Sequence, residues 1–480
     1  MTATSYQSLL ARRAEIMRRS VGIDYEQLRR GRLAWDYEAL MSEVPYELGE
    51  IARIQLDRGV GATALRELPN LSALVRSVAS AGRGARIFVK DEAANPSGSF
   101  KDRRASLSVF EAKSRGYAGV IAATSGNYGA AVASQAARAG LECIVVQEAF
   151  DSRGVGQPEI LEKARACEDF GAEVIQCTVG PELFYLFLRL LEETGYFNAS
   201  LYTPYSVAGI ETLGAEIAGD MRRLTGRDPD VVVITHAGGG NVTGTARGLL
   251  KAGAASTAIV AASVDLHGLH MASDRDFNRK SFTTGHSGFA FPFTIRPDRS
   301  DVPFNAARPL RYLDRMVLVT QGEVFYATEM LSKLEGIQRG PAGNTSLAAA
   351  LALARELPAE ATVVVQETEY TGAGKHPWAQ LAFASENGVE VRNGPRGEDV
   401  PGAVIAIPVE PGDLEVEEVD LRQLRTSYVR AALAGVDPTD IDDVDLGFLA
   451  EETRLGQVEI RELVDALGQT EATEQAVIET

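Results

Sequence analysis

Residues 95–103 read Asn95-Pro96-Ser97-Gly98-Ser99-Phe100-Lys101-Asp102-Arg103, and they lie between a predicted strand at 86–89 and a helix predicted to begin after Lys101. The lysine therefore stands at the N-terminal end of a helix, where backbone N–H groups and the helix dipole disfavour an ammonium group. The pKa of such a lysine falls, and its neutral amine is the form that makes a Schiff base with a carbonyl compound. A single lysine at a helix start is more often a solvated surface residue, so the rest of the sequence has to decide between the two interpretations.

Short apolar segments alternate with helical patterns on both sides of this stretch, which is typical of a parallel sheet covered by helices. Strands are predicted at 86–89, 119–123, 143–147, 173–177, 231–235, 258–262 and 362–366. Helices are predicted after Lys101, Asn127, Gln157, Pro181, Asn241 and Thr345, several of them ending at glycines such as Gly116, Gly140 and Gly195. The predicted fold class is α/β.

Two further loops follow predicted strands, where α/β folds bind their ligands. Residues 124–129 read Thr124-Ser125-Gly126-Asn127-Tyr128-Gly129, so that hydroxyls, an amide and backbone N–H groups meet at a helix start and suit a carboxylate. Residues 236–244 read His236-Ala237-Gly238-Gly239-Gly240-Asn241-Val242-Thr243-Gly244. Glycines in such a loop let the backbone N–H groups close on a phosphate.

The loop at 236–244 is also compatible with a dinucleotide site, with Asp265 about 25 residues further on as the partner of a ribose. The usual fingerprint has Gly or Ala where this chain has Thr243, and it leaves Lys101 unexplained. A Gly-rich loop taken alone is often only a turn. The dinucleotide interpretation is therefore disfavoured.

Composition excludes several classes of function. The chain has 480 residues, of which 45% are hydrophobic and 24% charged, enough for two or three domains. Of the net charge of -18, residues 410–480 contribute -14, since they hold 19 acidic and 5 basic residues. The acidity belongs to the C-terminal region and argues against nucleic-acid binding, while the nearly neutral body leaves room for a pocket that binds an anionic cofactor.

No segment approaches the roughly 18 apolar residues that would suggest a membrane span. The N-terminal segment, with Arg12, Arg13, Arg18 and Arg19, lacks the apolar centre of a signal peptide and is predicted to be an amphipathic helix of the folded protein. A cytoplasmic protein is expected.

Cysteines and histidines do not suggest a metal or a disulfide. Cys143, Cys167 and Cys177 lie inside predicted strands or a helix, and we expect them to be small apolar core residues rather than nucleophiles. The spacing of His267, His270 and His286, with no cysteine nearby, is a poor zinc pattern. No metal is expected.

Taken together and in this order, residues 95–103, 124–129 and 236–244 resemble the fold-type II pyridoxal-phosphate family, which is tryptophan synthase beta-like. Its threonine synthase branch has the patterns NPxGSFKDR and TSGNxG, which this chain matches. The resemblance implies two parallel-sheet domains with the cofactor between them.

The resemblance also assigns roles to residues. Lys101 would be catalytic and would carry pyridoxal 5'-phosphate as a Schiff base, and Asn127 would face the cofactor's 3'-oxygen. The phosphate would be held by Gly238, Gly239, Gly240 and Asn241. The substrate carboxylate would be held by Ser125, Gly126, Asn127, Tyr128 and Gly129.

The segment 370–377 looks like the TGxGxK loop of threonine synthases and makes Thr371 the candidate partner of the pyridine nitrogen. A neutral hydroxyl there leaves the ring nitrogen less cationic than an Asp would, which weakens the electron sink at Cα. The alternative is a buried threonine that caps a turn. His236 and His376 flank the phosphate and pyridine loops, and each either assists the chemistry or is structural.

Nearly the whole chain further resembles the family of 2-amino-4-oxopentanoate thiolase beta subunits of bacterial ornithine degradation, least of all beyond about Glu410. The matching segments are 22–25, 59–63, 146–148, 150–160, 179–184, 198–205 and 367–377. The resemblance implies an acyltransferase that cleaves (2R)-2-amino-4-oxopentanoate with coenzyme A to acetyl-CoA and D-alanine, or runs in reverse. Lys101 would move the Cα proton and the CoA thiolate would attack C4, so that no enzyme cysteine is required.

The predicted organisation has four parts. They are a helical arm with the start of the large domain at 1–92, a smaller domain with the lysine and the carboxylate loop at 93–212, the rest of the large domain with the phosphate loop at 213–409, and an acidic helical extension at 410–480. Helices are predicted around 421–433 and 449–467, and a long irregular segment at 265–305.

Partners follow from the same resemblance. An amino acid and CoA are the expected small molecules, but no loop obviously grips the adenosine diphosphate of CoA, and the acidic extension would repel it. A smaller alpha subunit and a homo-oligomeric core are expected. Two alternatives stay open: a related lyase or synthase that eliminates or replaces a group at Cβ or Cγ, and a non-catalytic regulator, against which the intact Lys101 argues.

Overall fold

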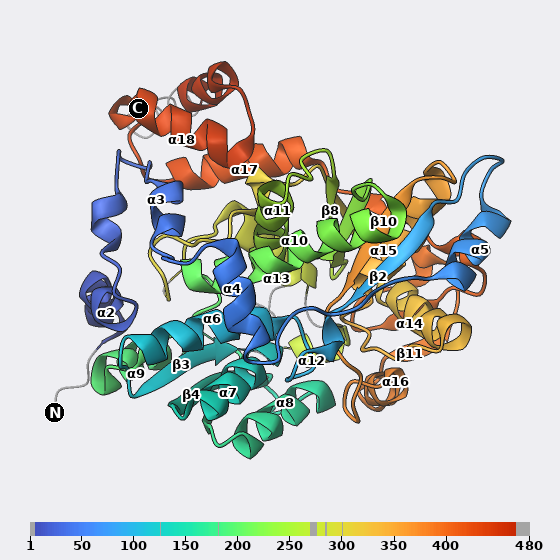
Figure 1. Cartoon of the computed structure of the whole chain (residues 1–480), viewed down its shortest axis with the longest axis horizontal. Helices are drawn as coiled ribbons and strands as arrows, with labels where there is room; N and C mark the ends of the chain where they lie inside the picture. The colour runs from blue at the N-terminus through green and yellow to red at the C-terminus, as the bar shows by residue number, and fades with distance from the viewer. Residues whose placement is uncertain are drawn as a thin grey trace, which may run out of the picture.

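The computed structural model of the chain describes residues 5–124, 126–180, 182–268, 276–283, 286–299 and 301–466. Two larger sheets of mostly parallel strands organise this part of the chain (Figure 1), and β11 (Glu390–Asn393) and β12 (Val404–Ile407) form a separate two-stranded parallel sheet. The predicted α/β class is therefore confirmed. None of the helices in the described ranges is long and apolar enough to cross a membrane.

The smaller sheet has the strand order β5-β4-β3-β6 and is parallel throughout. Its strands are β3 (Gly119–Thr124), β4 (Glu142–Phe150), β5 (Glu173–Thr178) and β6 (Phe197–Asn198). Helix α6 (Lys101–Ser114) precedes β3, and α7 (Asn127–Ala139), α8 (Pro158–Asp169) and α9 (Glu182–Thr194) connect the strands. Lys101 and Asn127 are thus each the first residue of a helix, as the sequence predicts.

The larger sheet has the order β1-β2-β10-β7-β8-β9-β13, with a parallel centre and antiparallel edge strands β1 and β13. Its strands are β1 (Leu65–Glu67), β2 (Arg86–Asp91), β7 (Val231–Thr235), β8 (Ala258–Val264), β9 (Arg315–Val319), β10 (Thr362–Glu367) and β13 (Glu417–Glu418). The main helices beside it are α5 (Pro69–Val78), α10 (Pro204–Thr225), α11 (Gly240–Lys251), α14 (Gln321–Glu335) and α15 (Thr345–Glu356).

Burial explains why the central strands of the larger sheet are continuous apolar runs. On β10, Val363 and Val365 belong to one hydrophobic cluster and Val364 to another, so both faces of the sheet are covered. The edge strand β1 has only three residues, two of them exposed, which is typical of a short strand at the edge of a sheet.

The remaining elements surround the two sheets. They are α1 (Tyr6–Ala11), α2 (Arg13–Ser20), α3 (Tyr37–Ser42), α4 (Leu48–Leu56), α12 (Phe277–Lys280), α13 (His286–Ile295), α16 (Pro377–Glu386), β11 (Glu390–Asn393), β12 (Val404–Ile407), α17 (Leu421–Leu433) and α18 (Asp443–Thr453). The segment at 265–305 is therefore partly helical, within its described residues. The helix predicted at 449–467 is interrupted at 454–456, where Arg454 has a φ of 57°, and it resumes at 457.

The acidic extension packs against the N-terminal arm (Figure 1). The carboxylate of Asp445 on α18 accepts hydrogen bonds from the backbone N–H groups of Leu33 and Ala34 at 2.8 and 2.7 Å. Trp35 of the arm stacks on Phe304 with ring centroids 4.8 Å apart and also contacts Phe448. The arm and the extension, far apart in sequence, therefore share one core. The three boundaries between the four predicted parts stay predictions.

Candidate active site

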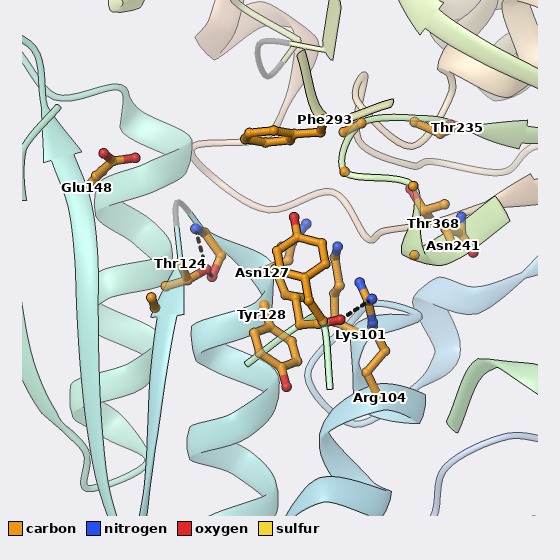
Figure 2. Close-up of a pocket in the computed structure, with 18 of the residues that line it drawn as sticks. Lys101, Arg104, Thr124, Asn127, Tyr128, Glu148, Thr235, Asn241, Phe293 and Thr368 are labelled. Carbon is orange, nitrogen blue, oxygen red and sulfur yellow. Dashed lines mark hydrogen bonds between the residues drawn. The ribbon is translucent and has the colours of Figure 1, made fainter. Parts of the chain in front are cut away.

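A cavity of about 640 Å³ opens where strands of both sheets reach their carboxyl ends (Figure 2). Its walls include residues that follow β3, β7 and β10, together with the start of α6. Parallel strands bring the loops at their carboxyl ends to one edge, so the three loops singled out in the sequence meet at this cavity.

Lys101 lies in the cavity wall with a strongly lowered pKa, at about 7. Burial is the largest cause, the nearby Arg104 guanidinium adds to it, and Glu369 opposes it. Burial, rather than the place of Lys101 at the helix start, is thus the main cause of the lowered pKa. At neutral pH a large share of Lys101 is the neutral amine that nucleophilic attack on a carbonyl requires.

Residues 97–102 hold Lys101 in place through contacts on both sides of the loop. The carboxylate of Asp102 accepts hydrogen bonds from the backbone N–H and the hydroxyl of Ser97 at 2.7 and 2.6 Å. The N–H of Phe100 donates to the carbonyl of Thr368 at 3.1 Å. Gly98 has a φ of 80°, and a Cβ there would clash with the ring of Tyr370. The lysine loop is thus tied to the loop after β10.

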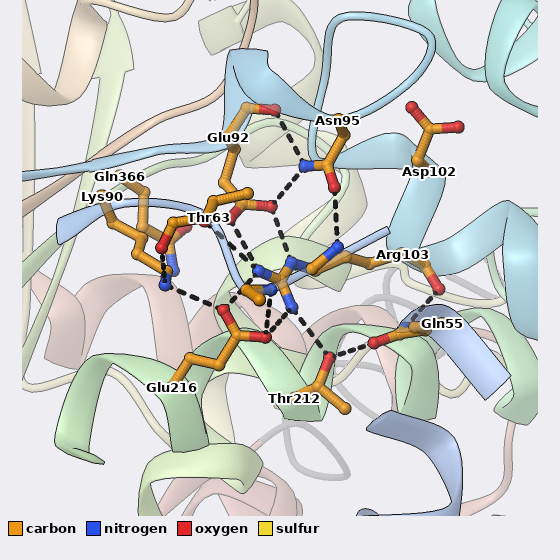
Figure 3. Close-up of polar contacts among 12 residues, drawn as sticks. Gln55, Thr63, Lys90, Glu92, Asn95, Asp102, Arg103, Thr212, Glu216 and Gln366 are labelled. Carbon is orange, nitrogen blue, oxygen red and sulfur yellow. Dashed lines mark hydrogen bonds and ion pairs between the residues drawn. The ribbon is translucent and has the colours of Figure 1, made fainter. Parts of the chain in front are cut away.

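Beneath this loop, Arg103 forms a buried ion network that joins four segments (Figure 3). Its guanidinium is fully buried and donates to Glu92 at 2.7 Å and to Glu216 at 2.8 Å. Lys90 also pairs with Glu216, at 2.8 Å. Burial would raise the pKa of Glu216, but Arg103 and Lys90 lower it to about 2. This network fixes the start of α6 against α10 and β2.

Asn127 is oriented by an acidic residue that the sequence analysis did not single out. Its Nδ2 donates to Glu369, which also pairs with the buried Lys375, and Lys375 pairs with Glu159 at 2.6 Å. Burial would raise the pKa of Glu369, but Lys375 and then Asn127 keep it below its usual value. Asn127 Oδ1 is buried and has no hydrogen-bond partner in the described structure. The amide oxygen is therefore available to a ligand.

The other predicted carboxylate-binding residues divide into three groups. Gly126 and Tyr128 line the cavity beside Asn127, whereas Gly129 is packed below it against Thr124 and Val145. The hydroxyl of Tyr128 points away from the cavity and donates to the carbonyl of Ala199 at 2.6 Å (Figure 2). Ser125 lies outside the described residues.

Gly238, Gly239, Gly240 and Asn241 all line the cavity at the N-terminus of α11. A Cβ would clash with Tyr202 at Gly238, with Pro309 at Gly239 and with Arg104 at Gly240. Pro309 therefore restricts Gly239 even without a ligand, whereas Gly238 and Gly240 are approached by the ends of the Tyr202 and Arg104 side chains. Gly239 also has a φ of 85°, which side chains rarely adopt.

Thr371 is not among the residues that line the cavity, although Thr368 and Glu369 of the same loop are. Its hydroxyl is buried, with no hydrogen-bond partner among the described residues. The structure therefore leaves the predicted role of Thr371 untested.

Arg104, Tyr202, Glu369 and Arg299 line the cavity and were missed in the sequence. Arg104 was accessible to sequence reasoning, because a residue three positions after Lys101 lies on the same helix face. Tyr202 and Glu369 lie in the matching segments 198–205 and 367–377, and Arg299 lies outside every matching segment. None of the three has a spacing from another site residue that predicts a place in the cavity, so only the fold brings them there.

Cys143 and Cys167 are buried, as expected of core residues, and the roles of His236 and His376 stay open. Burial raises the pKa of Cys143 and of Cys167 to about 12, and neither lines the cavity. His236 lines the cavity with Nε2 3.0 Å from the hydroxyl of Thr294, and His376 caps α16 by accepting the N–H of Trp378. Within the described residues no cluster of His, Cys, Asp and Glu could hold a metal ion.

Comparison with known proteins agrees with this geometry. Residues 56–369 match the profile of the family described as pyridoxal-phosphate dependent enzyme. The chain is 60% identical over 465 residues to a 2-amino-4-ketopentanoate thiolase beta subunit from an unknown prokaryotic organism, covering 97% of this chain and 98% of that protein. It is 60% identical over 450 residues to the protein of the same description from Acetoanaerobium sticklandii, covering 94% and 96%.

Among solved structures, a pyridoxal 5'-phosphate-dependent aspartate racemase superposes with a TM-score of 0.53 at 19% identity. The superposition covers 68% of this chain and 97% of the racemase. At this identity the likeness concerns the fold alone.

Proposed function

The chain belongs to the pyridoxal-phosphate dependent enzyme family, and on that premise we propose that it is the cofactor-bearing subunit of an enzyme that cleaves 2-amino-4-oxopentanoate with coenzyme A. The products are acetyl-CoA and alanine, in the D form if the substrate is the 2R isomer. The observation that carries the proposal is the 60% identity, over nearly the full length of both chains, to two thiolase beta subunits.

The residues around the cavity fit pyridoxal 5'-phosphate. A lysine whose pKa is about 7 supplies the amine. Several buried polar atoms of the cavity wall, Asn127 Oδ1, Asn241 Nδ2, Thr235 Oγ1 and Glu369 Oε1, have no hydrogen-bond partner within the described residues. Unsatisfied buried polar groups are costly, so their number in one cavity indicates a polar ligand. Gly238 to Asn241 would hold its phosphate, and Asn127 its 3'-oxygen.

Bound pyridoxal 5'-phosphate supplies an electron sink that stabilises negative charge at the Cα of an attached amino acid. The amine of Lys101 would take the Cα proton and return a proton to the substrate, which a pKa near 7 suits at neutral pH. Gly126, Asn127 and the N–H groups of the first turn of α7 would bind the substrate carboxylate. Glu369 and Lys375 keep the Asn127 side chain in position.

The acyl-transfer step needs a thiol that the cavity wall does not supply. Neither Cys143, Cys167 nor Cys177 lines the cavity, and burial raises the pKa of all three. The sulfur of CoA would therefore attack C4, and the C3–C4 bond would break with its electron pair left on C3. A proton added at C3 gives alanine, and the acetyl group leaves on sulfur.

A second subunit is part of the proposal, because both relatives are described as beta subunits. The cavity accounts for the cofactor and the amino acid. A smaller alpha subunit would then contribute to the binding of CoA.

The test compares two reactions of the purified chain. In deuterated water the chain alone should exchange the Cα proton of 2-amino-4-oxopentanoate without CoA. It should not release phosphate from O-phosphohomoserine, which a threonine synthase-like enzyme would do. Steady phosphate release from O-phosphohomoserine, together with no exchange of the Cα proton of 2-amino-4-oxopentanoate, would replace the proposal by the lyase or synthase alternative.

A further inference from the structure

Arg104 is a buried cation without an anionic partner in the described structure. Its side chain is 3% exposed, and its hydrogen bonds go to neutral groups, the hydroxyl of Ser206 at 3.0 Å and the carbonyl of Leu201 at 2.6 Å. Arg103 and Arg308, which are equally buried, each pair with a carboxylate. A buried charge left unpaired is strongly destabilising, so a guanidinium kept in this place calls for an anion.

The guanidinium faces the loop at the start of α11. A Cβ built on Gly240 would clash with Nη2 of Arg104, so the two groups are in contact. Lys101 and Arg104 are three residues apart on α6, and Figure 2 shows both side chains in the same part of the cavity, on the side where Asn241 lies. The N-terminus of the 12-residue helix α11 is itself positively polarised. The guanidinium of Arg104 and the N-terminus of α11 thus place positive charge at the same part of the cavity.

A third donor at the same place lacks an acceptor. Asn241 is the second residue of α11 and is 7% exposed, and its Nδ2 is buried without a hydrogen-bond partner among the described residues. A guanidinium, an amide and the N–H groups of a helix start are suited to a small anion with several oxygens and more than one negative charge.

We propose that Arg104 forms an ion pair with the phosphate of pyridoxal 5'-phosphate, so that this chain selects the phosphorylated cofactor by charge as well as by the backbone of Gly238 to Asn241. The inference uses the family's cofactor and the geometry of the cavity, and it does not depend on which amino acid is cleaved. Before the cofactor binds, Arg104 is an uncompensated charge that strains the empty protein. After binding, the phosphate balances it.

The test uses the variants Arg104→Gln and Arg104→Lys and compares pyridoxal 5'-phosphate with pyridoxal, which lacks the phosphate. Dissociation constants are measured by absorbance on protein stripped of cofactor. Arg104→Gln should weaken the binding of pyridoxal 5'-phosphate by about 30-fold or more, the range for breaking a buried charge pair, and leave that of pyridoxal nearly unchanged. Arg104→Lys should lie between, because a lysine keeps the charge but not the planar fork.

The control is Lys113→Gln, which removes one positive charge from the exposed end of the same helix. It should leave the ratio of the two dissociation constants at the wild-type value. A second readout separates binding from folding. Cofactor-free Arg104→Gln should melt at the same temperature as the cofactor-free wild type or higher, since an unpaired charge is removed, and the rise in Tm on adding the cofactor should shrink.

Phosphorus NMR of the wild type provides a measurement that needs no variant. The bound phosphate should keep the chemical shift of the dianion below pH 6, where the free phosphate takes up a proton near its pKa of about 6. The proposal would be overturned if Arg104→Gln had the same ratio of dissociation constants for pyridoxal and pyridoxal 5'-phosphate as the wild type. It would also be overturned if the bound phosphate took up a proton at the same pH as the free phosphate. A fall in the Tm of the cofactor-free variant with an unchanged cofactor response would show that Arg104 is structural.

Discussion

Lys101 owes its lowered pKa more to burial than to its place at the start of α6, and this matters for both reactivity and stability. The pKa of about 7 is below that of an exposed lysine, because burial and Arg104 together outweigh the attraction of Glu369. The neighbouring Arg103, which is just as buried, is held by carboxylates, and its pKa is raised. Lys101 and Arg103, two residues apart, therefore differ in function because only Arg103 forms ion pairs with carboxylates.

Replacing Lys101 tests the site directly. Lys101→Ala should lower turnover by roughly a thousandfold or more, because both the amine and the proton-transfer group are lost. Borohydride treatment should attach the cofactor to the tryptic peptide that contains Lys101 in the wild type, and to no peptide in the variant. The exposed Lys113→Ala on the same helix is the control. Full turnover by Lys101→Ala would refute the assignment.

Burial of Lys101 also predicts a pH dependence of stability in the cofactor-free protein. Since the folded pKa of about 7 is below the unfolded value, the unfolded chain binds more protons between these two values, and stability rises with pH across that window. Lys101→Met removes this dependence. The free energy of unfolding of Lys101→Met minus that of the wild type should fall by about 2 kcal/mol over the two pH units above neutrality. Urea unfolding at each pH measures it, and a constant difference would mean that Lys101 is not desolvated.

The loop at the start of α11 shows how an element can be required by the fold and the ligand together. Gly239 has a φ of 85°, and a side chain there would meet Pro309. Gly239→Val should therefore lower the free energy of unfolding by about 1–3 kcal/mol and weaken cofactor binding. The control is Gly219→Val on α10, where an added Cβ would have no neighbouring atom within 4 Å. It should neither weaken cofactor binding nor lower the free energy of unfolding to the same extent. If Gly239→Val bound as much cofactor as the wild type, the phosphate of the cofactor would not bind at the loop before α11.

Strands could be predicted from the sequence where a run of apolar residues is bounded by turn residues. All seven predicted strands occur, and six of them are largely buried runs of apolar residues, whereas the edge strand β5 has no buried residue. The short strands β6 and β13, of two residues each, carry no pattern that a sequence could reveal. β9 (Arg315–Val319) is an apolar run that the prediction overlooked.

The candidate site was predictable only in its motif-bearing parts. Lys101, Asn127 and Gly238 to Asn241 meet in the cavity as the motifs imply. The spacing from Lys101 predicts the place of Arg104, but the roles of Arg104 and Glu369 could not be predicted from the sequence. A charged residue reveals its role only through its burial and the presence or absence of a counter-ion. The contact between Glu369 and Asn127 likewise depends on the fold and could not be predicted. The role of Thr371 beside the pyridine nitrogen stays a prediction.

In the molecule as a whole, the described part of the C-terminal extension, residues 410–466, contributes to the folded core despite its acidity. Glu452 on α18 is 2% exposed and pairs with Arg308 at 3.2 Å and with Arg311 at 2.5 Å. Glu452→Gln should lower the free energy of unfolding by about 3 kcal/mol, because it leaves a buried guanidinium partly unpaired. Glu451→Gln, next along the same helix and 71% exposed, should change it by less than about 1 kcal/mol. Equal effects in urea unfolding would mean that the extension contributes only surface charge.

The most direct measurement is acetyl-CoA formation from 2-amino-4-oxopentanoate and CoA by this chain, alone and together with its candidate alpha subunit. The chain loaded with pyridoxal 5'-phosphate should exchange the Cα proton alone but form acetyl-CoA and alanine at full rate only with the partner, and Lys101→Ala should abolish both reactions. Formation of acetyl-CoA by the Lys101→Ala complex, or no acetyl-CoA from the complete wild-type complex, would contradict the account.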